Sequence, residues 1–339
     1  MAAARNIYEQ QAHNKRKTVI IVFLYIAVLA LMGYALDVLL LGLPNDALPL
    51  PLMTILSLGV ASGLAIWSLF SGWEAVLKST GAVPANPNDP LQKELLNVVE
   101  EMKIAAGLPM PKVYVIPDYD DNALATGRDP YHCAIAVTDS LLKDVDRDEL
   151  QGVVAHEMSH IRNYDIRLMT MIASLVGAVV LIGDGITEAL KRGMESSAYD
   201  RTEGDGGGGE WILMFPLYVI SWLIGVVLAP MILKVMAMGV SRSREYLADA
   251  SGAELTRNPA SLASALKKIG CDRIPTSSIK RATAHICIID PTGSGFNDME
   301  GWIAEVFGTH PPVLKRIKRL EAMAYHRRPQ IPHVPQVPH

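Results

Sequence analysis

Four long apolar segments constrain the fold of this chain more than any other feature of its sequence. The first runs from Thr18 to Leu36 without a charged residue, close to the ~20 apolar residues that a helix needs to cross a bilayer. It is too long for the core of a signal peptide, and no clear small-residue cleavage pattern follows it, so we interpret it as a membrane anchor. A second apolar segment, Leu48 to Phe70, follows a short polar turn. Together the two segments predict a transmembrane hairpin within residues 18–72.

The charges beside the first segment predict how this hairpin is oriented. Residues 1–17 are polar and carry the basic side chains of Arg5, Lys15, Arg16 and Lys17. Lysine and arginine are enriched in loops on the cytoplasmic side of a membrane. We therefore expect residues 1–17 to be a cytoplasmic N-terminal tail, and the two spans return the chain to the same side.

Two further apolar segments predict a second transmembrane hairpin within residues 168–236. One runs from Leu168 to about Ile186 and the other from Trp211 to about Met236, with the glycine-rich, acidic stretch 204–210 between them. Both contain more glycine, proline and aspartate than ideal spanning helices. The alternative is that they form buried helices of a large soluble core.

The rest of the chain has the composition of a soluble protein. We expect one soluble domain assembled from residues 73–167 and 237–325, followed by a disordered polar tail at 326–339. Leu91 to Ala106 has the spacing of an amphipathic helix, and short apolar runs that begin at Lys112 and His132 predict two strands. The expected fold is therefore mainly α, with four transmembrane helices and a cytoplasmic α+β domain that contains a small β-sheet.

Charge and cysteine content exclude several classes of protein. The net charge is only −4, which argues against a nucleic-acid binder, since no basic face dominates. The three cysteines, Cys133, Cys271 and Cys287, are odd in number, far apart and without a CxxC pair. This spacing indicates neither a disulfide framework nor a thiolate zinc site. We interpret them as small buried apolar residues in a reducing compartment.

An HExxH motif, formed by His156, Glu157 and His160, carries the chemistry of this sequence. Its surroundings predict a helix, with Asp146 and Glu149 spaced as a capping box. Residues four apart lie on the same face of a helix, so the two imidazoles can bind one zinc ion. Glu157 is placed to take a proton from a water molecule on that ion. The alternative is a chance match on a surface helix.

A third metal ligand must come from another segment, because a catalytic zinc usually has three protein ligands and one open position. The segment SRSREYLADASGAEL has strong helix formers, no proline, and two acids four apart on one face, Glu245 and Asp249. Glu245 is the expected ligand, and Asp249 can accept the outer N–H of a ligating histidine. The alternative for each acid is a solvated helix face with Arg242 and Arg244 as partners. Two predicted spans separate the motif from Glu245, so both segments emerge on the same side of the membrane.

The segments GVVAHEMSHIRNYDIR and SRSREYLADASGAEL resemble those of the HtpX-type membrane metallopeptidases, which are relatives of the CAAX prenyl proteases. NALATGRDP, IAVTDSLL and THPPVLKRIKRL also match that family in kind and order, so the resemblance covers nearly the whole chain. It implies that His156, His160 and Glu245 hold one Zn²⁺ per chain. It further implies that Glu157 is the catalytic glutamate and that Asp249 supports the ligand helix.

The resemblance also assigns residues around the metal. It places four residues in a segment that resembles a substrate-binding edge strand, to which an extended peptide can add: Asn122, Ala123, Leu124 and Ala125. His310 and Arg316 fall where the family brings a histidine and an arginine close to the metal, and either can stabilise the oxyanion. The alternatives are that Asn122 is a turn residue and that His310 starts a helix. Longer stretches at 199–210 and before His310 depart from the family pattern and leave the substrate preference open.

The implied function is that of a membrane-embedded zinc endopeptidase in the quality control of misfolded or damaged membrane proteins. Its partners would be polypeptide substrates and the lipid bilayer, with no nucleic acid. We expect a multi-pass protein of the inner (plasma) membrane whose active site faces the cytoplasm. The alternatives are a non-catalytic scaffold or chaperone with a structural zinc, a prenyl-protein endoprotease, which has more spans, and a zinc transporter. The last would use Asp37 and Asp184, acids within apolar segments.

Overall fold

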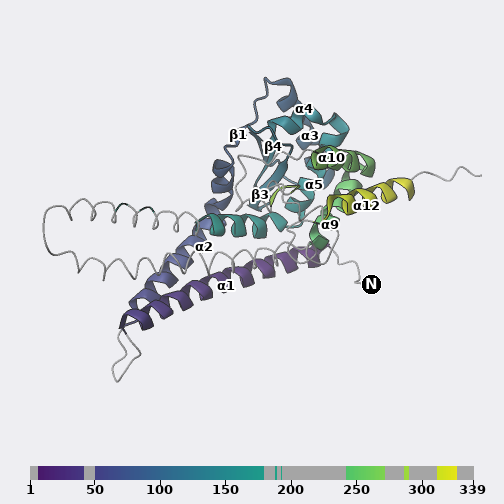
Figure 1. The fold of residues 1–339 in the computed structure, drawn as a ribbon. Helices are drawn as coiled ribbons and strands as arrows, with labels where there is room; N and C mark the ends of the chain where they lie inside the picture. The colour runs from purple at the N-terminus through teal and green to yellow at the C-terminus, as the bar shows by residue number, and fades with distance from the viewer. Residues whose placement is uncertain are drawn as a thin grey trace, which may run out of the picture.

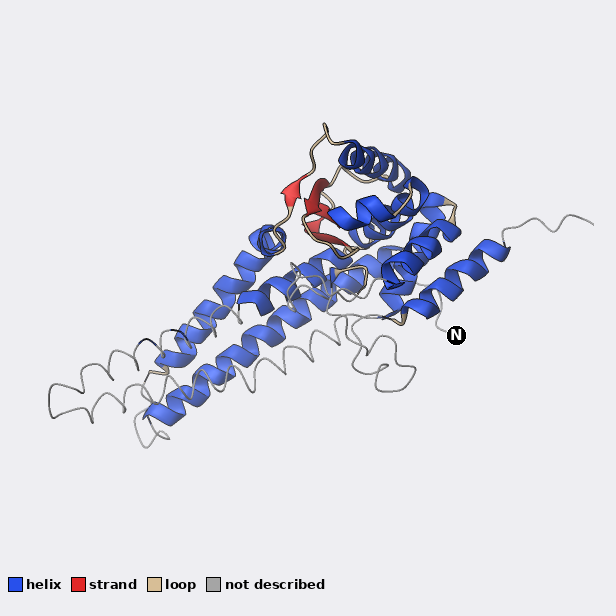
Figure 2. Ribbon diagram, turned by 45° about the horizontal axis from the view of Figure 1, so that its top comes forward, coloured by secondary structure: helices blue, strands red, loops and turns tan. Residues whose placement is uncertain are grey.

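The computed structural model describes residues 7–41, 50–178, 188, 192, 242–271, 286–289 and 311–326. Two long helices, α1 (Ile7–Leu41) and α2 (Leu52–Ser79), lie side by side and extend from a body that contains the other labelled elements (Figure 1). That body holds one four-stranded sheet among helices, as Figure 2 shows. The prediction of a mainly α fold with a small sheet is confirmed.

Both helices of this pair are long and apolar enough to cross a membrane. In their most apolar windows only 11% and 17% of the residues are buried against the rest of the protein. Phe23, Leu31, Leu56 and Ile66 are among the large apolar side chains that lie exposed on them. Apolar surface of this extent needs an apolar partner, and a bilayer supplies one. The first predicted hairpin therefore has the structure expected of two spans.

Helix α1 begins earlier than the sequence suggests. It starts at Ile7, so residues 7–17 of the expected tail are helical and run continuously into the first apolar segment, and residues 1–6 lie outside the described part of the chain. The third apolar segment is described only up to residue 178, and all of the fourth lies outside the described residues, as does the tail at 326–339 apart from its first residue. Residues 165–178 are helical, and Leu168, Ile172 and Leu175 among them are buried inside the protein.

Asp37, on α1, makes hydrogen bonds to the start of α2. Its carboxylate accepts hydrogen bonds from the backbone N–H groups of Met53 (2.9 Å) and Thr54 (2.8 Å) and from the Thr54 hydroxyl (2.7 Å). It thereby satisfies the first free N–H groups of α2, which lacks a side-chain cap of its own. This bonding accounts for an acid within an apolar helix without a transport path. Asp184 lies outside the described residues.

The sheet contains β1 (Val83–Pro84), β2 (Lys112–Ile116), β3 (Ala123–Asp129) and β4 (His132–Thr138), in the order β1-β2-β4-β3. Strands β2 and β4 are parallel, and the β1–β2 and β3–β4 pairs are antiparallel. Two of these strands, β2 and β4, were predicted from their apolar runs. Strand β3 is an edge strand of the sheet.

Side chains alternate between the two faces of the sheet. In β4, Cys133, Ile135 and Val137 pack with α3 (Pro90–Ala106) and α5 (Arg147–Arg162) in one core cluster. Ala134 and Ala136 pack on the other face, with Trp73 and Val76 at the end of α2 and with Met169 and Ala173 of the helical stretch 165–178. The alternation follows from the two-residue period of a strand. A continuous core therefore joins the membrane hairpin to the sheet.

Four further helices belong to the body. They are α4 (Asp139–Asp144), α9 (Arg242–Thr256), α10 (Pro259–Cys271) and α12 (Val313–His326). Helices α9 and α10 both pack on α5, and α12 packs on α9 and α10. Segments far apart in the sequence thus meet around α5. Cys133 and Cys287 are buried and are not joined in a disulfide, as their spacing indicated.

Candidate metal centre

Helix α5 is fixed at its start by the predicted capping box. The Asp146 carboxylate accepts from the Glu149 N–H (2.9 Å), and the Glu149 carboxylate accepts from the Asp146 N–H (2.8 Å). Val153, Val154 and Ile161 hold the helix in the core. The motif on this helix is buried: His156 is 0% exposed, Glu157 1% and His160 5%. The motif therefore does not lie on a surface helix.

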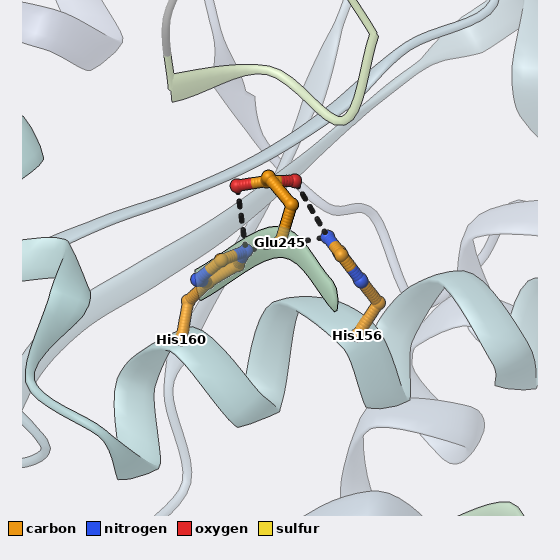
Figure 3. A group of neighbouring side chains, drawn as sticks. All are labelled: His156, His160 and Glu245. Carbon is orange, nitrogen blue, oxygen red and sulfur yellow. Dashed lines mark hydrogen bonds and ion pairs between the residues drawn. The ribbon is translucent and has the colours of Figure 1, made fainter. Parts of the chain in front are cut away.

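Three side chains converge on one point between α5 and α9. The Nε2 atoms of His156 and His160 are 3.2 Å apart, and the carboxylate oxygens of Glu245 lie 3.7 Å and 3.6 Å from them (Figure 3). Two nitrogens bound to one tetrahedral zinc at ~2.0–2.1 Å would be separated by about 3.3 Å. All three donor atoms lie within 4.8 Å of one another. Spacing and donor chemistry therefore both fit a metal ion.

Each imidazole is oriented by a carboxylate on its other nitrogen. His156 Nδ1 lies 3.1 Å from Asp249 Oδ1, and His160 Nδ1 lies 3.2 Å from Asp165 Oδ2. Acceptors in these positions fix the ring planes and leave Nε2 for a metal. Asp249 was predicted for this position. Asp165 was missed, although it follows the motif by five residues and lies in the segment quoted for the family resemblance.

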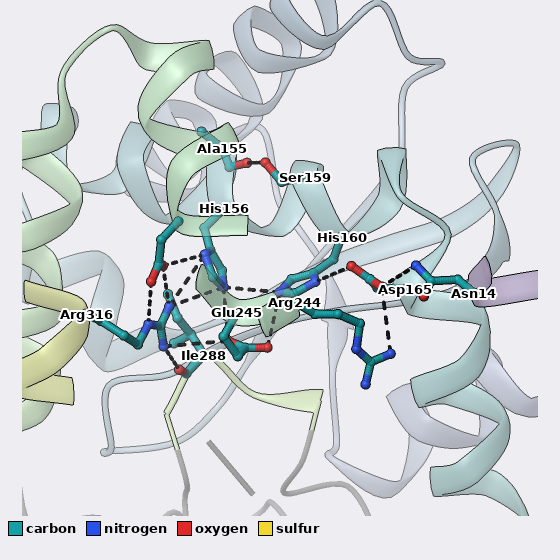
Figure 4. A network of polar contacts seen from close by, with 11 residues as sticks. Asn14, Ala155, His156, Ser159, His160, Asp165, Arg244, Glu245, Ile288 and Arg316 are labelled. Atoms are coloured by element: carbon teal, nitrogen blue, oxygen red, sulfur yellow. Dashed lines mark hydrogen bonds and ion pairs between the residues drawn. The ribbon is translucent and has the colours of Figure 1, made fainter. Parts of the chain in front are cut away.

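Arg316 lies in the same group of side chains, fully buried on α12. Its Nε donates to Asp249 Oδ2 (2.9 Å), its Nη2 to Asp249 Oδ1 (2.7 Å) and its Nη1 to the Ile288 carbonyl (2.7 Å). Nη1 is also 3.7 Å from Glu245 Oε2. Arg316 is thus close to the ligands, as the resemblance implies, and it is held by two acids and a carbonyl (Figure 4). His310 lies outside the described residues.

Both acids of α9 are buried, so the solvated-face alternative is wrong for them. Glu245 is 2% exposed and Asp249 3%. Of the two arginines considered as their partners, Arg244 has its Nη1 3.7 Å from Asp165 Oδ1. The side chain of Arg242 is outside the described part of the chain.

Burial and charge change the acidity of the central groups. Burial raises the pKa of Glu157 to about 7. Burial also lowers the pKa of His156. For His160 burial acts in the same direction, but the hydrogen bond to Asp165 and the charge of Glu245 outweigh it and raise the pKa to about 9. Burial opposes ionisation of Asp249, yet Arg316 and the hydrogen bond to His156 hold the pKa of that carboxyl below its usual range.

Comparison with known proteins decides the family. The model of peptidase family M48 matches residues 90–324. The chain belongs to peptidase family M48. A protease HtpX homolog of Thermoanaerobacter pseudethanolicus is 39% identical over 321 residues, which cover 94% of this chain and 98% of the relative. One from Tropheryma whipplei (strain Twist) is 40% identical over 317 residues, with 94% and 98% covered.

The solved structure of S. mikatae Ste24p shares 16% identity with this M48 peptidase at a TM-score of 0.46, covering 93% of this chain and 67% of that one. A likeness at this level does not by itself establish a shared fold. Family membership makes the chain a membrane-associated metalloprotease.

The predicted substrate edge of this M48 peptidase is partly covered by its own chain. Ala123, Leu124 and Ala125 lie on β3, and Asn122 directly precedes it. Leu124 pairs with Cys287 in an antiparallel bridge, and the Ile288 N–H donates to the Ala123 carbonyl (2.9 Å). Residues 286–289 therefore occupy the edge at this point. Sequence reasoning missed this contact, because residues 286–289 are far from β3 in the chain.

Glycine at position 252 lets α9 approach the motif of the M48 peptidase. A Cβ added there would lie 3.1 Å from the His156 backbone nitrogen and 3.3 Å from the Ala155 carbonyl carbon. We expect Gly252→Val to push α9 away from α5, to destabilise the fold by about 1–3 kcal/mol through overpacking, and to weaken metal binding. Thermal unfolding and chelator competition measure the two effects. Ser251→Val on the same helix is the control, and equal behaviour of the two variants would contradict the close approach.

Proposed function

We propose that this M48 peptidase hydrolyses peptide bonds with a zinc ion held by His156, His160 and Glu245. The observation that carries the proposal is the convergence of three buried donor groups beside the buried carboxylate of Glu157. A zinc ion bound there would supply Lewis acidity and a water molecule that is acidic near neutral pH. Soft thiolate ligands are not needed at such a site, and a His₂Glu donor set is common in zinc proteases.

Glu157 is the proton carrier in this proposal. Its carboxylate lies beside the backbone N–H of Ala125 on β3 and makes no other hydrogen bond within the described residues, so it is available to a water molecule and a substrate. A pKa near 7 suits a group that takes a proton from the attacking water and returns it to the leaving amine. A structural zinc site has no need of such an acid, and this argues against a non-catalytic scaffold.

Arg316 and Asp249 position the ligands in this proposal. Asp249 holds His156 through Nδ1, and the bidentate contact with Arg316 fixes the orientation of Asp249. The Arg316 guanidinium also offsets the negative charge of Glu245. These contacts favour a positioning role for Arg316, and His310 stays a candidate for oxyanion stabilisation.

An extended substrate is proposed to add at β3. Because residues 286–289 pair at Leu124, the substrate would use the edge beyond Leu124 or displace that segment. The proposed substrates are misfolded or damaged membrane proteins, a class that follows from the resemblance and from the relatives' name, protease HtpX homolog. A prenyl-protein substrate is the alternative within the same family.

The proposed location is the inner (plasma) membrane, with four spans and the active site on the cytoplasmic side. Support comes from Lys15, whose ammonium lies 4.1 Å from the ring centroid of Tyr164, next to the end of α5. The basic end of α1 and the metal centre are therefore at the same end of the molecule. If the positive-inside rule applies to Lys15, Arg16 and Lys17, the metal centre faces the cytoplasm.

The test uses the full chain purified in detergent. We expect about one zinc per chain by elemental analysis and cleavage of an unfolded protein substrate. A chelator should abolish cleavage, and added Zn²⁺ should restore it whereas Mg²⁺, which prefers oxygen ligands in octahedral geometry, should not. Undiminished cleavage after zinc removal would contradict the proposal. Bound zinc without cleavage of any of several substrates would favour the scaffold.

A further inference from the structure

We propose that Asn14, on membrane helix α1, is a positioning residue for the metal ligand His160 and acts on it through Asp165. The inference rests on the proposed metal site and adds to it a support that comes from the membrane hairpin. Asn14 and Asp165 are 1% and 0% exposed, and they join α1 to the end of α5 (Figure 4).

The hydrogen bonds fix the direction of the Asn14 amide. Its Nδ2 donates to Asp165 Oδ1 (2.6 Å) and to the Asn163 carbonyl (2.9 Å). Both partners are acceptors only, so the NH₂ group must be the part that faces them. Both amide hydrogens are then used, one on the backbone at the end of α5 and one on the carboxylate behind His160.

Asp165 connects Asn14 to the proposed metal ligand His160. Its other oxygen, Oδ2, lies 3.2 Å from His160 Nδ1, and Oδ1 is also 3.7 Å from Arg244 Nη1. A carboxylate held on one side by Asn14 and Arg244 has little freedom to rotate about its own axis. The oxygen that faces His160 therefore stays in place, and the imidazole keeps its Nε2 directed at Glu245 and His156.

A neighbouring residue separates this role from simple docking of α1. Gln11 lies one turn earlier on the same helix, and its Nε2 donates to the Arg162 carbonyl at the end of α5 (2.8 Å). Gln11 thus attaches α1 to the same place as Asn14 does, but this bond goes to backbone and not to Asp165. Asn14 differs in reaching the carboxylate that orients a ligand.

The experiment is a double-mutant cycle read out as zinc affinity by chelator competition, on the full chain in detergent. Asn14→Ala should weaken zinc binding about tenfold, the low end of the range for groups that orient a ligand. Asn14→Asp should weaken it further, because two carboxylates then face each other. Asp165→Asn should also weaken it, because its amide NH₂ opposes that of Asn14 or turns toward His160.

The combination Asn14→Asp with Asp165→Asn exchanges donor and acceptor and keeps the contact between the two side chains. The amide introduced at position 165 would donate to the carboxylate introduced at position 14, and its oxygen would accept from His160. The carboxylate introduced at position 14 cannot donate to the Asn163 carbonyl as the Asn14 amide does, so zinc affinity should recover only in part, to a value above that of either single variant. Gln11→Ala should leave zinc affinity unchanged.

Two results would overturn the proposal. One is an equal loss of zinc affinity in Gln11→Ala and Asn14→Ala, which would indicate docking alone. The other is a double variant no better than its parents. Melting temperatures and far-ultraviolet circular dichroism identify any variant that has unfolded. If a variant of the cycle has unfolded, the comparison of zinc affinity between Asn14→Ala and Gln11→Ala decides between positioning and docking. A wild-type protein that binds no zinc would contradict the proposed function itself, which is a distinguishable outcome.

Discussion

The Glu157→Gln variant is expected to keep its zinc and to lose peptide hydrolysis by about a thousandfold or more, within the range for loss of a positioned general base. Glutamine has nearly the same shape as glutamate, so the packing of α5 and the two histidines should be preserved. An amide can neither take a proton from water nor return one to the leaving amine. Because Glu157 holds no ligand position in the site, zinc content should not change.

Three measurements on matched preparations test this expectation: zinc per chain, melting temperature, and the rate of cleavage of an unfolded protein. Glu100→Gln, at an exposed position of α3, is the control for the chemical change alone. Substantial activity in Glu157→Gln with zinc still bound would remove Glu157 from the proposed mechanism. Loss of zinc together with activity would instead make Glu157 part of the metal site.

Local sequence signals account for the elements that were predicted. The capping box at Asp146 and Glu149 and the four-residue spacing of the motif are properties of one helix, so they can be read without knowing any other part of the fold. The same holds for α9, which was predicted from the strong helix formers and the absence of proline in its segment. These two helices supply all three proposed ligands.

Contacts between distant segments explain what the sequence could not reveal. In the sequence, Asp165 is an ordinary acid before an apolar run. Only the fold shows that its carboxylate lies beside His160 Nδ1. Asn14 was placed in a polar tail, because no local sequence pattern indicates that α1 begins at Ile7 or that its first turns contact the end of α5. Residues 286–289 have no pattern of their own that indicates pairing with β3. In each of these three cases the contacting residue lies in another part of the chain or on the far side of a turn, where helix and strand periodicity give no information.

Glu245→Gln tests whether the third ligand comes from α9. We expect zinc affinity to fall by more than about a hundredfold, because loss of a ligand should exceed the 10–100-fold cost of losing a group that only orients one. Hydrolysis should be lost with the zinc. Glu254→Gln is a matched control, the same substitution at an exposed position of the same helix, and it should leave both zinc affinity and hydrolysis at wild-type values.

The result also bears on the path of the chain between the two ligand helices. His160 and Glu245 can bind one ion only if α5 and α9 lie on the same side of the membrane, so the chain between them must cross an even number of times or not at all. A large loss of zinc affinity in Glu245→Gln, with none in Glu254→Gln, would therefore exclude a single crossing of the membrane between α5 and α9. It would be consistent with two crossings, as in the predicted second hairpin, or with none. Unchanged zinc affinity in Glu245→Gln would mean that another residue completes the site, and the argument from even crossings would lose its basis.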